Sequence, residues 1–202
     1  MELKSFGFAV EYDVQALSGV PDTDLVHRFR REGRPPPPGH LILETGSGDS
    51  SDFVVAVTPL ASRPWIGCFE RGPGGISGLF ATPSADTLCV VVQGQGYWVP
   101  VLDPTNFEMI RSVPIKEAFA IPEIELLVFV DFIRLSGYGP EGCRWHTDSL
   151  SWDGLEITEV TTQSIRGLAW DSPAGQDVEF VVDVENGSHK GGSSSEGYGL
   201  SG

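Results

Sequence analysis

The sequence predicts a mainly β protein made of antiparallel meanders, and three observations support this class. From Trp65 onward, apolar runs alternate with turn signals about every 8 to 15 residues, which is the spacing of consecutive antiparallel strands. The 25 glycines and 15 prolines are more chain breakers than a helical bundle tolerates. A segment in the middle of the chain also occurs twice, at residues 76–92 and 115–131.

The two copies are related by an offset of 39 residues. The residues that match are Ile76 with Ile115, Phe80 with Phe119, Ala81 with Ala120, Pro83 with Pro122 and Leu88 with Leu127. A weaker third copy begins at Ile165, where Leu168 takes the place of Ala118. A one-residue insertion then brings Pro173, Phe180 and Val181 into line. We therefore expect a repeat of approximately 40 residues.

Residues 1–64 differ from the rest of the chain. Phe6, Phe8 and Val10 alternate as in a first strand, and a short helix is predicted over residues 24–31. The four prolines at 35–38 fix φ and cannot donate hydrogen bonds, so they predict an extended connector. Two strands follow, at 40–45 and 53–58.

From Trp65 the predicted strands follow one another closely. They cover residues 65–70, 76–81, 88–92, 97–102, 115–120, 126–130, 133–138, 143–147, 155–161, 165–171 and 178–184. We predict a single mainly β domain over residues 1–185, with 1–64 as an atypical N-terminal part and 65–185 as the repeated meander. Residues 186–202 are rich in Gly and Ser and predict a flexible tail.

Each unit contains a strand, a Pro-containing turn, a Leu-Val run, a short hairpin and an aromatic strand. The segments with this order are 80–104, 119–142 and 165–173. The order resembles a blade of a β-propeller of the WD40 type, whose period is near 40 residues. The resemblance implies a propeller-like fold, although it points to no family of known function. A sandwich-like arrangement of similar hairpins is the alternative.

The formal net charge of −15 repels phosphate backbones and anionic lipid headgroups, so we expect neither nucleic acid nor membrane as a partner. No apolar stretch has the length of a signal peptide core or a membrane span, which predicts a cytoplasmic location. The three cysteines, Cys68, Cys89 and Cys143, have neither an even number nor a CxxC spacing. They indicate reduced thiols and not a disulfide framework.

Two groups of residues are candidates for binding. Four of the 13 basic residues, Arg28, Arg30, Arg31 and Arg34, lie close together and could receive an acidic ligand. A solvated loop or helix end is the alternative. Trp98 and Trp145 are candidate ligand platforms, with packing in the core or across a hairpin as the alternative.

One pair of residues is a candidate for catalysis. His146 and Asp148 would point to the same face of a strand, and a carboxylate beside an imidazole can orient it as a general base. The four histidines show no metal-ligand spacing, so we expect no metal and no cofactor. Asp131 interrupts the most apolar run of the chain, and we expect it at a turn.

The sequence thus predicts a non-enzymatic binding or protein-interaction module whose ligand is a protein or a small molecule. The alternative is a hydrolase or lyase in which acidic residues and His146 converge from separate strands. A cleft holding His146 beside two carboxylates would favour the enzyme. A flat or funnel-shaped aromatic rim without titrating groups of shifted pKa would favour binding.

Overall fold

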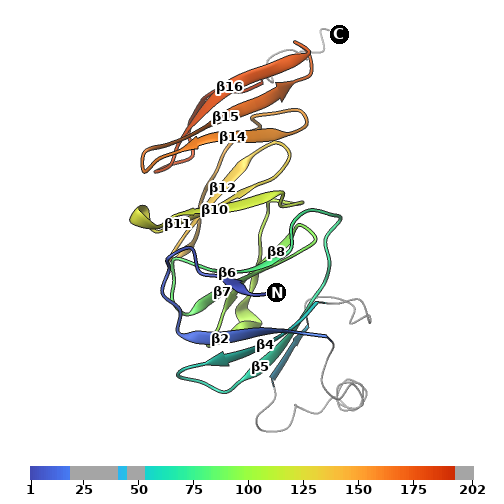
Figure 1. Ribbon diagram of the computed structural model, residues 1–202, viewed down its shortest axis with the longest axis vertical. Coiled ribbons are helices and arrows are strands. Elements are labelled where there is room, and N and C mark those ends of the chain that lie inside the picture. The colour runs from blue at the N-terminus through green and yellow to red at the C-terminus, as the bar shows by residue number, and fades with distance from the viewer. Residues whose placement is uncertain (19–40, 45–52, 194–202) are drawn as a thin grey trace. The chain divides into compact units, whose positions relative to one another are not determined.

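The protein is mainly β, as predicted (Figure 1). The computed structural model describes residues 1–18, 41–44 and 53–193, and in this part of the chain the helical elements are the short 3-10 turns η1 (Pro104–Asn106) and η2 (Pro122–Ile124). No described helix is long and apolar enough to span a membrane. The chain divides into two compact units, residues 1–110 and 111–202. The single domain over residues 1–185 stays a prediction.

Unit 1 contains two sheets. In the first, the strands lie in the order β1 (Leu3–Lys4), β6 (Gly78–Ala81), β7 (Thr87–Val92), β8 (Gln95–Pro100) and β9 (Glu108–Met109). In the second, the order is β2 (Tyr12–Leu17), β4 (Phe53–Pro59), β5 (Trp65–Phe69) and β3 (Leu41–Glu44). β6 to β9 form an antiparallel meander, whereas β1 joins β6 and β3 joins β5 in parallel.

Two expectations for residues 1–70 were wrong. Phe6 has a φ of 53° and lies in a turn that Phe8 closes by donating to the carbonyl oxygen of Ser5, so residues 5–10 form no strand. β5 does not begin the repeated meander either. It pairs with β4 instead, with Trp65 opposite Val57. The turn between β4 and β5 reverses the chain, so the two strands form an antiparallel hairpin.

The core of unit 1 lies between its two sheets and is tied by polar groups of aromatic side chains. The Tyr12 hydroxyl donates to the Thr87 carbonyl oxygen at 3.1 Å, and the Trp65 indole donates to the Val101 carbonyl oxygen at 3.0 Å. Each bond satisfies a polar atom that would otherwise be buried without a partner. Burial raises the pKa of the Tyr12 phenol, so Tyr12 stays protonated at any ordinary pH.

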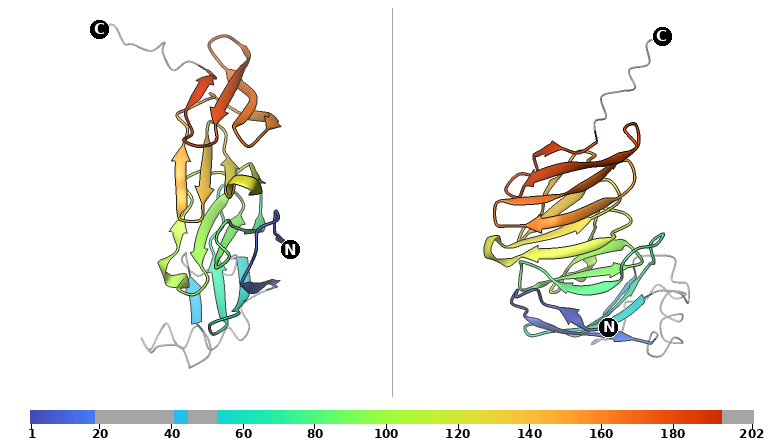
Figure 2. Two further views of the ribbon diagram at one scale, coloured as in Figure 1. Left: turned by 90° about the vertical axis from the view of Figure 1, so that its left-hand side faces the viewer. Right: turned by 45° about the horizontal axis from the view of Figure 1, so that its top comes forward.

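Unit 2 consists of two four-stranded antiparallel meanders, which lie side by side in the yellow-to-red part of Figure 2. The first contains β10 (Glu117–Ile121), β11 (Leu126–Val130), β12 (Leu135–Gly139) and β13 (Gly142–His146). The second contains β14 (Leu155–Val160), β15 (Ser164–Asp171), β16 (Gln176–Asp183) and β17 (His189–Gly191). This up-and-down order is that of a propeller blade.

β17 lies inside the segment that we expected to be a flexible tail from residue 186. Its strand pairing with β16 is continued by the amide of Gly192, which donates to Glu179, and by that of Ser193, which donates to Leu150. These hydrogen bonds order a segment that has little apolar surface of its own. Residues 194–202 lie outside the described residues.

The duplicated segments pair with the same register. Ala81 lies opposite Leu88 in the first segment, and Ala120 lies opposite Leu127 in the second, an offset of 39 residues on both strands. The next hairpin keeps this offset, with Leu88 opposite Val99 and Leu127 opposite Tyr138. The prediction that both segments form the same antiparallel meander is confirmed.

The third copy was placed wrongly. It falls on β15 and β16, the second and third strands of their sheet, whereas the second copy falls on β10 and β11, the first and second strands of theirs. Phe180 also lies opposite Gly167 and not opposite Leu168. Hairpins with similar apolar alternation look alike in sequence whichever strands of a sheet they form.

The core of unit 2 lies between its two sheets. Its central strand β11 is fully buried, with Leu126, Val128 and Val130 in this core and Phe129 on the other face beside Tyr138, 5.3 Å between ring centroids. The prediction that β11 is covered on both faces is confirmed. Asp131 follows it in a turn, as predicted. There Oδ1 accepts hydrogen bonds from the amides of Ile133 and Arg134, each 2.8 Å.

Candidate functional site

Of the six candidate binding residues, two are buried and four lie outside the described residues. Arg28, Arg30, Arg31 and Arg34 lie outside the described residues. Trp98 and Trp145 are each 6% exposed, so neither offers a ring face to solvent. Trp145 belongs to the core of unit 2, where its indole nitrogen donates to the Val184 carbonyl oxygen at 2.8 Å.

His146, the candidate base, is half-buried at the end of β13, and both of its ring nitrogens have partners. Nδ1 lies 2.7 Å from Ser136 Oγ, and Nε2 lies 3.2 Å from Cys143 Sγ. Burial lowers the pKa of His146, and the positive charges of Arg111 and Arg134 lower it further, while Asp131 acts weakly in the opposite direction. The imidazole is therefore neutral at pH 7.

Asp148 lies with His146 in one hollow of about 510 Å³, although β13 ends at His146 and Asp148 lies beyond the strand. The other lining residues are Asn186, Gly187, Ser188 and His189 from the turn between β16 and β17. Gly187 has a φ of 73°, and a Cβ there would lie 2.8 Å from the Trp145 ring, so this turn requires glycine. The hollow holds one described carboxylate beside His146, where the enzyme alternative called for two.

A second candidate is the outer face of the sheet β14–β17, the face opposite the core. Side chains alternate along β15, so Ile165 and Ala169 face the core while Arg166, Leu168 and Trp170 face outward. The register places Glu156 and Glu179 on either side of Leu168, and Asp177 opposite Trp170. Half-buried Leu168 and exposed Trp170 are therefore surrounded by carboxylates.

Trp170 lines a hollow at one end of this outer face. The hollow has a volume of about 270 Å³ and is lined by Asp153, Gly154, Leu155, Glu156, Leu168, Trp170 and Asp177. Trp170 is 38% exposed, and the three carboxylates of the lining are on exposed residues. We call Asp153, Glu156, Trp170 and Asp177 the acidic hollow. An aromatic ring among carboxylates is suited to a cationic side chain.

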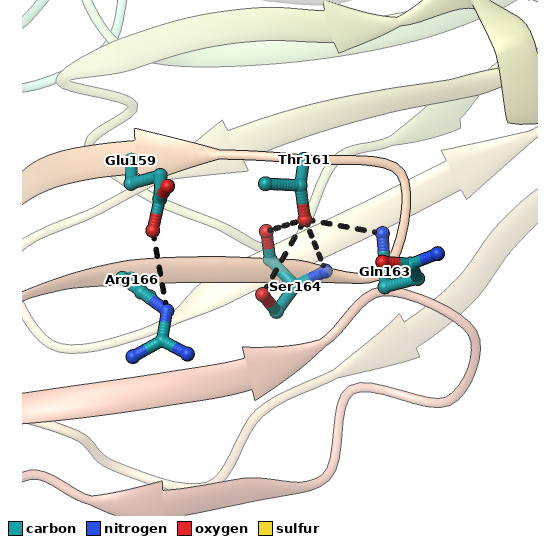
Figure 3. Close-up of polar contacts among 5 residues, drawn as sticks. All are labelled: Glu159, Thr161, Gln163, Ser164 and Arg166. Carbon is teal, nitrogen blue, oxygen red and sulfur yellow. Dashed lines mark hydrogen bonds and ion pairs between the residues drawn. The ribbon is translucent and has the colours of Figure 1, made fainter.

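The turn between β14 and β15 lies at the other end of this face (Figure 3). Thr161 Oγ1 accepts hydrogen bonds from the amides of Gln163 and Ser164, at 3.2 and 2.9 Å, and donates to the Ser164 carbonyl oxygen at 3.0 Å. Beside the turn, Arg166 Nε lies 3.2 Å from Glu159 Oε2. The carboxylate of Glu159 is thus already paired with a cation. Among the described residues, no ion pair involves the carboxylates of the acidic hollow.

Sequence reasoning missed both Trp170 and Cys143. The alternation of Ile165, Gly167 and Ala169 with Arg166, Leu168 and Trp170 is the signal that could have placed Trp170 on an outer face. No such signal linked Cys143 to His146, because residues three apart in a regular strand point to opposite faces. Among the described residues, no group of three or more His, Cys, Asp or Glu side chains is arranged to hold a metal ion.

No protein-family model matches this chain, and no curated protein matches it significantly. Among solved structures, a chain in the S. cerevisiae complex of Dbp5 bound to Nup159, Gle1, IP6 and ADP is 12% identical, with a TM-score of 0.38. The N-terminal domain of Nup159 is 13% identical, with a TM-score of 0.35. Each match covers 93% of this chain and 52% of the other, so this chain spans about half their length. The β class rests on the strands themselves.

Proposed function

We propose that this protein is a non-enzymatic interaction module that binds a basic segment of a protein partner at the acidic hollow on the outer face of β14–β17. The proposal includes a cytoplasmic location, and it includes neither nucleic acid nor membrane as a partner. We further propose that the four sheets are propeller-like blades, of which this one presents the binding face.

The observation that supports the binding site is the setting of Trp170. Its ring is 38% exposed and lies in one hollow with the carboxylates of Asp153, Glu156 and Asp177. A Lys or Arg side chain placed on such a ring gains a cation–π contact and buries its aliphatic stem, while its charge faces the carboxylates. Aromatic anchors of this kind contribute most of the affinity in protein interfaces.

Charge supports a basic partner over a neutral or acidic one. The chain carries a formal net charge of −15, and the carboxylates of Glu156, Asp177 and Glu179 lie along one sheet face. Complementary charge steers a basic segment towards this face and repels an acidic one.

The alternative of a hydrolase or lyase has less support. His146 shares its hollow with Asp148 alone among the described carboxylates, and its ring nitrogens are directed to Cys143 and Ser136. A general base that abstracts a proton from a substrate needs a nitrogen directed at that substrate. The one exposed aromatic ring among carboxylates in the acidic hollow supports binding.

Binding of Lys/Arg-rich peptides, measured by Trp fluorescence and by calorimetry, tests the proposal. Trp170→Ala should weaken binding about tenfold or more, as for an anchor residue, and Glu156→Gln with Asp177→Asn should weaken it similarly. Trp152→Ala is the matched control, because Trp152 is 46% exposed but lines a different hollow. Equal loss of affinity in both tryptophan variants, or equal affinity for Glu-rich peptides, would refute the proposal.

A further inference from the structure

The end of β13 places a cysteine and a histidine on the same face of their sheet. Cys143 pairs with Tyr138 and Trp145 pairs with Gly137, so Arg144 is an extra residue that forms a β-bulge. Because of this bulge, Cys143 and His146 both face the side of Tyr138 and Ser136, although they are three residues apart. Their sulfur and Nε2 atoms are 3.2 Å apart.

Buried hydroxyl groups orient the imidazole. His146 Nδ1 lies 2.7 Å from Ser136 Oγ, which in turn lies 2.6 Å from Ser112 Oγ, and both serines are fully buried. With its proton on Nδ1, the ring donates to Ser136 and directs the lone pair of Nε2 at the Cys143 thiol, whose other acceptor is the Trp145 carbonyl oxygen at 3.8 Å. The order is that of an activated nucleophile: a thiol, a base, and a group that orients the base.

The surroundings leave this thiol within reach of a reagent. Cys143 is exposed, whereas Cys68 and Cys89 are buried. Burial, and then the positive charges of Arg111 and Arg134, lower the pKa of His146, so the ring is neutral at pH 7 and one ring nitrogen carries a lone pair. Asp131 acts in the opposite direction, and Asp148 and His189 line the same hollow as His146.

We propose that Cys143 is a reactive thiol that exchanges with low-molecular-weight disulfides, with His146 as its general base. As Cys143 Sγ attacks one sulfur of the disulfide, its proton passes to His146 Nε2. A new S–S bond forms to Cys143 while the S–S bond of the reagent breaks, and the departing thiolate takes the proton from His146. The protein is left with a mixed disulfide, and no further oxidant is needed. This modification site is separate from the acidic hollow.

The experiment measures the rate at which oxidised glutathione and iodoacetamide modify each cysteine at pH 7, by mass spectrometry of the digested protein. Cys143 in the folded protein should react faster than Cys143 in urea-unfolded protein, and Cys68 and Cys89 should stay unmodified in the folded state. His146→Gln should lower the Cys143 rate about tenfold or more. His189→Gln is the control from the same hollow and should leave the rate within about twofold.

Two results would overturn the proposal. One is a Cys143 rate in the folded wild-type protein that is no higher than in the unfolded chain, a comparison that depends on no variant. The other is an unchanged Cys143 rate in a folded His146→Gln variant, which would mean that exposure alone sets the reactivity.

Discussion

At the scale of single residues, polar atoms in the interior are held by specific partners. Asp131 accepts two main-chain amides, and Ser136 links His146 to Ser112. The sequence indicated a turn at Asp131 because a carboxylate within an apolar run needs such donors. It could not reveal the Ser136–Ser112 contact, since those residues are 24 positions apart and neither lies in a recognisable motif.

His146 should make stability depend on pH. Its pKa in the folded protein is lowered below the ordinary value of 6.5, so below that pH the unfolded chain binds more protons than the folded one. Its contribution to stability is therefore present at neutral pH and is lost as pH falls through the folded pKa. Urea unfolding should show a steeper loss of stability from about pH 7 to 5 for wild type than for His146→Gln. Parallel curves for the two proteins would contradict this.

Phe129 should contribute much more to stability than Phe132, three residues along the chain. Phe129 is fully buried and packs against Tyr138, whereas Phe132 is 39% exposed, with Lys116 over its ring. Phe129→Ala should lower the free energy of unfolding by about 3 to 5 kcal/mol, because it leaves a cavity. Phe132→Ala should cost about 1 kcal/mol or less. Similar losses in urea unfolding would show that β11 is not the centre of its sheet.

At the scale of elements, strand length decided what the sequence could predict. Strands of five to eight residues such as β11, β15 and β16 carry enough alternation and are bounded by enough turn residues to be recognised. β1, β9 and β17 have two or three residues and show no period. Their pairing depends on a neighbouring strand edge, as does the parallel pairing of β3 with β5.

The candidate sites also depend on how neighbouring strands pair. His146 and Asp148 were predicted to share a face if their strand continued, but β13 ends at His146, so the strand period does not explain why both residues line one hollow. Cys143 joins His146 through a bulge, whose position depends on the partner strand β12. The acidic hollow collects residues from β14, β15 and β16, so it exists only once their register is set.

The turn between β14 and β15 should depend on the Thr161 hydroxyl. Valine keeps the shape of threonine but loses the bonds to Gln163 and Ser164, so Thr161→Val should destabilise the protein by about 1 kcal/mol. Glu159→Gln removes the neighbouring ion pair, whose side chains are more than half exposed, and should cost about 0.5 kcal/mol or less. Thermal unfolding of both variants checks this order, and a larger loss for Glu159→Gln would contradict it.

At the scale of the whole molecule, the excess of acidic residues affects which partners are attracted to the protein. A net charge of −15 on 202 residues favours cationic partners over anionic ones well beyond contact distance at low salt. Neighbouring carboxylates on one face, as in the acidic hollow, concentrate this field where a large apolar ring is also exposed. Long-range attraction and short-range recognition then act at the same place.

Salt should therefore separate these two contributions. The Debye length falls from about 10 Å at 0.1 M salt to about 3 Å at 1 M, so added salt screens the long-range attraction but leaves contact with the Trp170 ring largely intact. Affinity for a Lys/Arg-rich peptide should fall about tenfold or more between 0.05 and 0.5 M NaCl, mainly through a slower association rate.

Two variants separate the ring from the charges. Trp170→Ala should bind more weakly at every salt concentration but lose the same fraction of its affinity as salt is added, because it removes the ring and no charge. The double variant Glu156→Gln with Asp177→Asn should make the affinity depend less on salt. Surface plasmon resonance across a salt series measures both rate constants, and an affinity independent of salt would mean that the carboxylates of the acidic hollow do not face the ligand.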